Sequence, residues 1–392
     1  MRTRLKVNDF EILDSIRGIA SLYVAIAHCR GVLWVGGNQY LKMVPYSTWN
    51  IWDYLIFGSS MLTRLAVEFV IVFFVLSGFS IAHSLSSSKS PLKFYLRRLI
   101  RIYPSYVFAL IWAGLVYVIT KNLYPQWYDG TLTTFSFERT VEMNNFFDKT
   151  IMLNNLFYRA DNGFLAPFWS LTYEVIFYLI APFVLRRVNL YAIVSVILFA
   201  VNIISPAFIQ SIKIPTYINA FLFTYNIYFV MGVMLYVHFF SIQNVFAKLS
   251  RTQLLFILLI SLAITYFLKF YFVFESVFRF LSAALLGVLL VVYFIKHQVK
   301  IGWLMSIGRY SYTLYITHLA SVYLYLALFW SIFKHSTPYI MNYFVWMPAV
   351  LFVLVIAWIQ YLLVEKKTKI ILDKLRKPGT VKKTVPVMAS AN

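Results

Sequence analysis

Three ionisable residues lie inside the first long apolar stretch of this sequence, where burying a charge is costly and a functional role is the default hypothesis. The stretch, LDSIRGIASLYVAIAHC at 13–29, contains Asp14, Arg17 and His28. In a helix, the spacing places Arg17 and His28 within roughly 20° of one face and about 16 Å apart along the axis. Asp14 is one turn before Arg17 and is expected to pair with it. His28 is a candidate general base, and a core histidine bonded to a neighbour is the alternative.

A carboxylate occupies a comparable position in a later apolar stretch. In APFWSLTYEVIFYLIAP, at 166–182, Glu174 follows Ser170 by four residues and precedes Tyr178 by four. This spacing puts the three side chains in one polar stripe on a helix. A buried carboxylate must be paired or protonated, so Glu174 is a second candidate for a role in chemistry.

His318 is a third candidate within an apolar stretch. In IGRYSYTLYITH, at 307–318, the residues Gly308, Ser311, Tyr315 and His318 follow helical spacing on one face. Ordinary helix packing accounts for Ser311 and Tyr315 taken singly. For His318, near the middle of its stretch, a functional role is favoured.

Arginines gather in RRLIRIYP at 97–104. Arg98 and Arg101 are one turn apart, and Pro104 is expected to reset the backbone after them. One interpretation is anchoring at the cytoplasmic membrane surface. The other is a phosphate clamp, because guanidinium groups bind pyrophosphate with paired hydrogen bonds. The arginines alone do not decide between the two.

Other patterns limit the chemistry. The sequence contains neither a G-x-S-x-G nucleophile motif nor metal-type His and Cys spacing, and no metal is expected. The pair Ser77-Gly78 favours close approach of two helices. Glu68 is another buried acid, but its spacing places it on the opposite face from Ser77.

The elements that position these residues are membrane-spanning helices. Of the 392 residues, 61% are hydrophobic and 12% are charged, against about half and a quarter in soluble domains. About ten apolar stretches approach the length of ~20 residues that a spanning helix needs. They are 14–35, 63–86, 100–120, 166–185, 189–209, 217–239, 253–271, 277–295, 307–333 and 343–364. The sequence therefore predicts an all-α polytopic bundle.

The distribution of charge predicts the orientation of the bundle. The net charge is +21, but the basic residues lie between spans, so nucleic-acid binding is rejected. If the N-terminus is cytoplasmic, the inner segments hold 23 of the 35 Lys and Arg residues, which places both termini in the cytoplasm. Residues 1–365 are expected to form the membrane domain and 366–392 a basic, disordered tail.

Two further features complete the expected organisation. The single cysteine, Cys29, excludes an internal disulfide. The longest segment between spans, about 121–165, is expected on the outer side, where it caps the bundle or binds a sugar. Its acidic residues are Asp129, Glu138, Glu142, Asp148 and Asp161.

These segments, in this order, resemble acyltransferase family 3, the bacterial membrane acyltransferases that O-acylate glycans. The resemblance rests on LDSIRGIASLYVAIAH at 13–28, FFVLSGF at 73–79, RRLIRIYP at 97–104, FWSLTYEVIFY at 168–178 and IGRYSYTLYITH at 307–318. It departs at Ile71, where many members have Glu or Asp, and at Thr172-Tyr173 before the glutamate, where Ser-Val or similar is commoner.

The resemblance implies a location in the bacterial inner membrane and an acyl-CoA donor, with acetyl-CoA favoured and no permanently bound cofactor. His28 then corresponds to the catalytic histidine and Arg17 to its partner. Arg98 and Arg101 correspond to the R-x-x-R implicated in handling acyl-CoA. Glu174 corresponds to the acid of the W-S-L-x-x-E motif.

The function expected on these grounds is transfer of an acyl group, with acetyl favoured, to a hydroxyl of a cell-surface or lipid-linked glycan. Supporting roles are assigned to Asp14, Ser170, Trp169, Tyr315 and His318. A proton-coupled transporter or flippase remains an alternative, because buried His, Glu and Arg also suit proton coupling. A purely structural subunit leaves the intramembrane charges unexplained.

Overall fold

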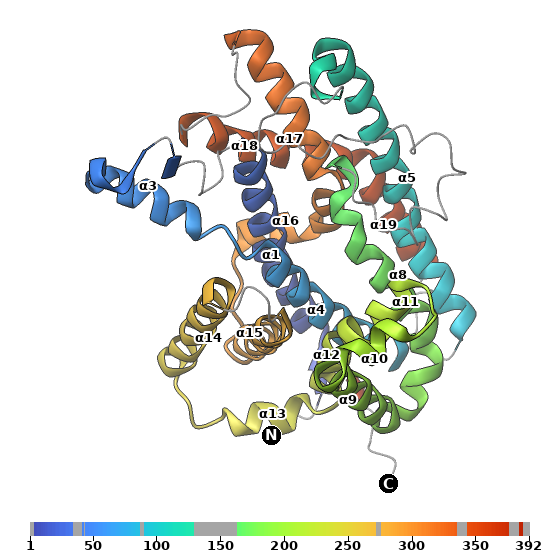
Figure 1. Cartoon of the computed structure of the whole chain (residues 1–392). Helices are drawn as coiled ribbons and strands as arrows, with labels where there is room; N and C mark the ends of the chain where they lie inside the picture. Colours follow the sequence, from blue (N-terminus) through green and yellow to red (C-terminus); the bar gives the residue numbers. More distant parts are fainter. Residues whose placement is uncertain are drawn as a thin grey trace.

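The chain is almost entirely helical over the part that the structure covers (Figure 1). The computed structural model describes residues 4–33, 41–42, 44–86, 90–128, 163–271, 276–334, 343–375 and 384–386. The five acidic residues expected in the outer segment, from Asp129 to Asp161, lie outside the described residues.

Ten helices overlap the ten spans predicted from the sequence, although the sixth and ninth spans also contain shorter elements. They are α1 (Val7–Leu33), α4 (Ala66–Ser86), α5 (Pro91–Leu123), α8 (Trp169–Val184), α9 (Val188–Ile204), α12 (Asn226–Val237), α14 (Arg251–Tyr271), α15 (Ser276–Lys296), α17 (Ser311–Phe333) and α18 (Tyr343–Gln360). Within the described residues, 8 helical stretches are long and apolar enough to cross a membrane. One of them, Phe164–Ile204, includes both α8 and α9, and α1 with its charged residues is not among the 8. The prediction of an all-α polytopic bundle is confirmed.

The shorter elements connect or extend these helices. They are α3 (Ile51–Met61), α10 (Pro206–Ser211), α11 (Thr216–Ala220), α13 (Phe239–Val245), α16 (Gly302–Arg309), α19 (Lys366–Leu375), the 3-10 turns η1 (Tyr46–Thr48), η2 (Pro125–Trp127), η3 (Gly163–Phe168) and η4 (Leu185–Arg187), and the π turns η5 (Phe221–Tyr225) and η6 (Tyr361–Glu365). The sequence did not predict α3, which begins with a capping box of Asn50 and Asp53 and extends away from the bundle (Figure 1).

Pro104 lies inside α5, and the expectation that it resets the backbone is wrong. A proline removes one backbone N–H, but membrane helices tolerate it where neighbouring groups satisfy the freed carbonyl. Arg98 and Arg101 consequently lie in the first turns of the same helix that continues to Leu123.

The ninth predicted span is not one helix, because the chain turns at Tyr310 between α16 and α17. Tyr310 has φ −114° and ψ 19°, outside the helical region. Gly308 therefore lies on α16, and only Ser311, Tyr315 and His318 share α17. The expectation of one continuous face from Gly308 to His318 is corrected.

Glycines allow the central helices to meet backbone to backbone. A Cβ atom on Gly18 of α1 would lie 2.1 Å from the carbonyl oxygen of Leu304 on α16. One on Gly78 of α4 would lie 2.0 Å from the carbonyl oxygen of Phe229 on α12. The close approach predicted at Ser77-Gly78 is thus confirmed, and these two crossings fix the helices that carry the polar residues.

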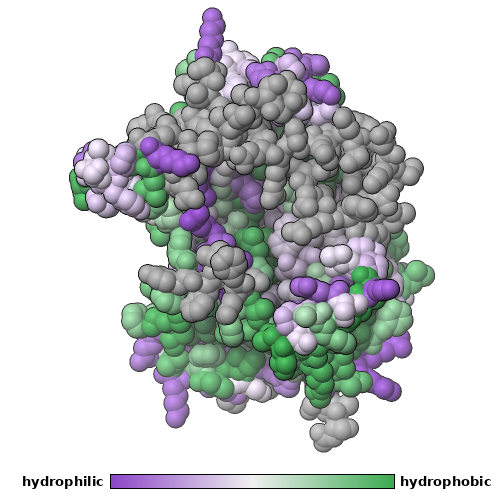
Figure 2. Space-filling view, in the orientation of Figure 1, coloured by the Kyte–Doolittle hydropathy of each residue, from purple (hydrophilic) through white to green (hydrophobic). Residues whose placement is uncertain are grey.

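The outer surface of the bundle is apolar. In Figure 2, apolar side chains gather over the lower part of the face, and hydrophilic side chains project at its edge. Exposed residues on two peripheral helices include Phe256 and Leu259 of α14 and Ile193 and Ile197 of α9. Such a surface requires lipid, so the chain is a multi-pass integral membrane protein.

The two ends of the chain lie together. Strand β1 (Arg4–Lys6) pairs antiparallel with β2 (Thr384–Pro386). The segment from residue 366 on, expected to be a disordered tail, therefore contains both α19 and β2. Contacts with the rest of the bundle order α19, since its Thr368 is buried.

Candidate active site

A pocket among α1, α4, α5, α8 and α17 gathers most of the residues that the sequence singled out. Its volume is about 100 Å³. The polar residues that line it are Arg17, Ser77, Ser80, Arg98, Arg101, Ser170, Glu174, Tyr178, Ser311, Tyr312 and Tyr315. Residues separated by hundreds of positions in the sequence thus share one concave site, the usual form of a small-molecule site.

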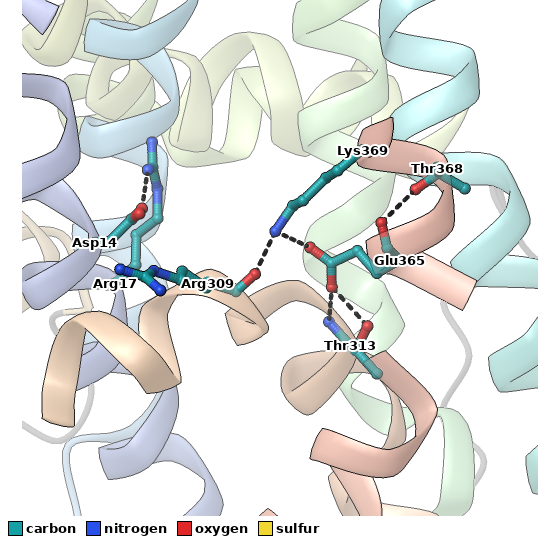
Figure 3. A network of polar contacts seen from close by, with 7 residues as sticks. All are labelled: Asp14, Arg17, Arg309, Thr313, Glu365, Thr368 and Lys369. Carbon is teal, nitrogen blue, oxygen red and sulfur yellow. Dashed lines mark hydrogen bonds and ion pairs between the residues drawn. The ribbon is translucent and has the colours of Figure 1, made fainter. Parts of the chain in front are cut away.

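Cations dominate the lining of this pocket. Three arginines face a single carboxylate, that of Glu174. Arg17 donates one hydrogen bond to Asp14 at 2.8 Å, as expected (Figure 3). It donates another to Ser80 Oγ at 2.9 Å. Arg98 and Arg101 form no ion pair with a described carboxylate. Their guanidinium groups therefore remain available for an anion.

Arg98 is held in place by aromatic rings. Its guanidinium carbon lies 5.4 Å from the ring centre of Tyr178 and 5.5 Å from that of Phe94. These cation–π contacts orient the side chain without neutralising its charge. Arg98 is half-buried and Arg101 is exposed, so the positive charge extends from the surface into the pocket.

Glu174 forms a polar cluster with α4 and with its own helix. Ser77 Oγ donates a hydrogen bond to Glu174 Oε1 at 3.1 Å, and Tyr178 OH donates to the same oxygen. The predicted stripe on α8 is therefore real for Glu174 and Tyr178. The carboxylate also partly balances the charge of the arginines in the pocket.

Ser170 and Tyr315 form a second hydroxyl pair in the lining. Their oxygens lie 2.7 Å apart, and Tyr315 OH donates to the carbonyl oxygen of Pro167 at 3.0 Å. Pro167 belongs to η3, so this contact joins α17 to the turn that precedes α8. The hydroxyl groups lie next to the part of α17 that carries His318.

His28 and His318 contact each other directly. His318 Nε2 lies 3.2 Å from His28 Nδ1, and the ring centres are 4.8 Å apart. Neither ring lines the pocket, but the ring centre of Tyr315, which does, lies 6.0 Å from that of His318. The histidine pair is thus one helical turn beyond the pocket lining on α17.

The hydrogen bonds around the histidine pair assign its protons. His318 Nδ1 lies 2.7 Å from the carbonyl oxygen of Tyr315, and His28 Nδ1 lies 2.9 Å from that of Val24. A carbonyl only accepts, so both Nδ1 atoms carry hydrogen in the neutral rings. His318 Nε2 then accepts from His28 Nδ1–H, and His28 Nε2 carries a free lone pair. Histidines 290 positions apart in the sequence therefore form one unit.

Two residues proposed from the sequence lie elsewhere. Trp169 does not line the pocket, and its ring lies 5.5 Å from the ring centre of Tyr225 and 5.9 Å from that of Tyr173. Glu68 is buried with Arg279 and Lys269, at 2.9 Å and 3.4 Å, away from Ser77 and Glu174. Its position agrees with the opposite face that the sequence assigned to it.

The structure adds pocket residues that sequence reasoning missed as site residues. Ser77 and Ser80 on α4 bind Glu174 and Arg17, and Tyr312 on α17 lines the pocket. The sequence could have predicted the two serines, because they are three residues apart and therefore lie on one face of an otherwise apolar helix. Among the described residues, no group of three or more His, Cys, Asp or Glu side chains is arranged to hold a metal ion.

The fold and the pocket together define a multi-pass membrane protein with a buried, positively charged site. Residues 10–362 match the model of acyltransferase family 3, described as an acyltransferase domain. Because the match covers nearly the whole chain, the protein belongs to this family and is a membrane acyltransferase. No curated protein and no solved structure matched the chain.

Proposed function

We propose that this protein transfers an acyl group, acetyl in the first instance, from cytoplasmic acyl-CoA to a hydroxyl of a cell-surface or lipid-linked glycan in the bacterial inner membrane. The observation that carries the proposal is the pocket in which Arg98 and Arg101 form no ion pair with a described carboxylate and whose lining on α17 ends one turn before His318, the partner of His28. This reaction requires a cationic site for its anionic donor and a base for the acceptor hydroxyl, and the pocket with the histidine pair offers both.

The arginines suit the donor. Coenzyme A carries a diphosphate and a further phosphate, and guanidinium groups bind such oxygens with paired hydrogen bonds. Arg98 and Arg101 hold the phosphates near the pocket entrance, with help from Arg17. The pantetheine arm then extends past Ser77 and Glu174 and brings the thioester towards Tyr315.

His28 suits the chemical step. Its free Nε2 lone pair takes the proton of the sugar hydroxyl, and the hydroxyl oxygen attacks the thioester carbonyl carbon. The tetrahedral intermediate collapses as the carbon–sulfur bond breaks. The imidazolium returns the proton to the departing thiolate, which gives an ester on the sugar and free CoA. His318 stabilises the imidazolium through the hydrogen bond to His28 Nδ1.

Other side chains support this step. Hydroxyl groups of Tyr315 or Ser311, which line the pocket on α17, donate to the oxyanion in this scheme. Trp169 suits this role less well, since it does not line the pocket. Glu174 balances the arginine charge, and Asp14 orients Arg17 through the ion pair at 2.8 Å.

The experiment is CoA release by the purified protein in lipid nanodiscs, with acetyl-CoA as donor and a membrane glycan extract as acceptor. Wild-type protein should release CoA and add the acetyl mass to the acceptor. His28→Ala should lower the rate by about 10²- to 10⁴-fold, the usual contribution of a general base, while the protein still inserts and folds. Acylation at the wild-type rate by this variant would contradict the assignment of His28.

Two further arms separate the parts of the proposal. Arg98→Ala with Arg101→Ala should raise KM for acetyl-CoA with a smaller effect on kcat, whereas unchanged donor binding would remove the phosphate clamp. A covalent acyl-His28 intermediate predicts labelling of the protein by acetyl-CoA before acceptor is added. A transporter or flippase would release no CoA at all.

A further inference from the structure

The corner between α16 and α17 lacks a local cap. Tyr310 precedes α17 and its side chain makes no capping hydrogen bond, so the first N–H groups of α17 need partners from elsewhere. This corner matters because Ser311, Tyr312 and Tyr315 of α17 line the pocket. His318 follows Tyr315 by one turn.

Glu365 provides the missing cap from a distant element. Its Oε2 accepts hydrogen bonds from Thr313 Oγ1 at 2.6 Å and from Thr313 N at 3.3 Å. Thr313 is in the first turn of α17, where a carboxylate is favoured by the helix dipole. Glu365 is only 4% exposed and closes the π turn η6. Such turns are frequent at functional sites.

Lys369 completes the arrangement at the other helix. Its Nζ lies 3.0 Å from Glu365 Oε1 and also donates to the carbonyl oxygen of Arg309, the last residue of α16. A cation is favoured at a helix C-terminus, as an anion is at an N-terminus. Glu365 and Lys369 therefore bind both helices of the corner. The carboxylate lies at the N-terminus of α17 and the ammonium group at the C-terminus of α16, as the two helix dipoles favour.

The corner is held from its opposite side by α1. The backbone of Gly308 packs directly on that of Asp14, which in turn binds Arg17. Figure 3 shows Asp14 and Arg17 on one side of Arg309, and Glu365 with Lys369 on the other. The position of the corner therefore sets how far the pocket residues of α17 lie from Arg17 of α1.

We infer that Glu365 and Lys369 are positioning residues for the site. They hold the start of α17 in register with α1, so that Tyr315 and His318 face Arg17 and His28. Neither side chain lines the pocket. The activity arm of the test rests on the proposed function, whereas the structural arm does not.

The structural arm is hydrogen exchange of the amides at 311–318, measured by mass spectrometry on the full chain in nanodiscs. Glu365→Ala should accelerate exchange in the first turn of α17 by about tenfold or more, because Thr313 N loses its acceptor. Glu365→Gln keeps a carbonyl acceptor and should restore most of the protection. Lys367→Met, which removes one charge from the exposed side of α19, is the matched control and should leave exchange unchanged.

The activity arm compares kcat and KM for acetyl-CoA in the same variants. Glu365→Ala should lower kcat about tenfold or more per folded protein at unchanged KM, since the arginines remain in place, and Glu365→Gln should recover part of it. If Glu365→Ala does not fold, Thr313→Val tests the same contact by removing its hydroxyl donor. Wild-type kcat or wild-type exchange in both Glu365→Ala and Thr313→Val would overturn the inference.

The two proposals fail in different ways. If the wild-type protein releases no CoA, the proposed function is wrong, while the exchange data still decide whether Glu365 holds the corner. If the wild-type protein is active and Glu365→Ala lowers only thermal stability, Glu365 is structural and the positioning role is wrong.

Discussion

The orientation of one imidazole ring decides whether His28 can act as a base. Its Nδ1–H is shared between the carbonyl oxygen of Val24 and the ring nitrogen of His318, at 2.9 Å and 3.2 Å. These contacts fix the tautomer and leave Nε2 bare. Without them either nitrogen could carry the proton, and the ring would be less often ready to accept another.

We expect His318→Leu to lower kcat about fivefold, because one hydrogen bond contributes about 1 kcal/mol and about 1.36 kcal/mol corresponds to a tenfold change in rate. His318→Gln offers a carbonyl oxygen to His28 Nδ1–H and should lie between Leu and wild type. CoA release per folded protein is the measurement. Equal rates in all three proteins would show that His318 only fills the core.

At the level of elements, the site depends on helices that touch through their backbones. Gly18 and Gly308 bring α1 and α16 together, and Gly78 and Gly232 bring α4 and α12 together. The first crossing positions Arg17, and the second positions Ser77 and Ser80. Small residues permit this approach in a membrane, where packing rather than the hydrophobic effect drives helix association.

Gly308→Ala should therefore destabilise the protein. The added Cβ would lie 1.8 Å from the carbonyl oxygen of Asp14, and the backbone cannot yield as a flexible side chain would. Overpacking of this kind costs about 1–3 kcal/mol, so we expect a lower melting temperature in detergent. Gly302→Ala, on the same helix α16 with nothing within 4 Å, is the control. Equal melting temperatures for the two variants would contradict this account of the crossing.

Considered as a whole, the molecule is a bundle whose ends meet. The pairing of β1 with β2 brings the N-terminal and C-terminal segments to one side. The pocket arginines of α5 lie in its first turns, and α17 lines the pocket with its first residues. If the N-terminus is in the cytoplasm, as the basic residues predict, the start of α5 with its pocket arginines lies towards the cytoplasmic side, where the proposed acyl-CoA donor is found.

This orientation predicts the accessibility of introduced cysteines. The native Cys29 is buried and should not react. Ser211→Cys, at the end of α10, should be labelled in intact cells by a membrane-impermeant maleimide. Ser250→Cys, just before α14, should be labelled only after permeabilisation. Both positions are exposed, so the opposite pattern would reverse the orientation of the bundle.

The sequence by itself determined the fold class and most candidates for chemistry. Apolar stretches long enough to cross a bilayer specify helices, since every backbone polar group must be satisfied within the segment. The pairing of Asp14 with Arg17, and of Glu174 with Tyr178, followed from spacing within one helix. Local periodicity fixes such contacts before any tertiary packing is known.

Contacts between distant segments were decided only by the tertiary structure. Spacing could not predict that His28 meets His318, that Ser77 binds Glu174, or that Glu365 caps α17, because these pairs come from different helices. The turn at Tyr310 and the uninterrupted helix through Pro104 depend on neighbouring elements in the same way. The ionisable residues were visible in the sequence, but helix packing arranges them into one pocket with the histidine pair beside it.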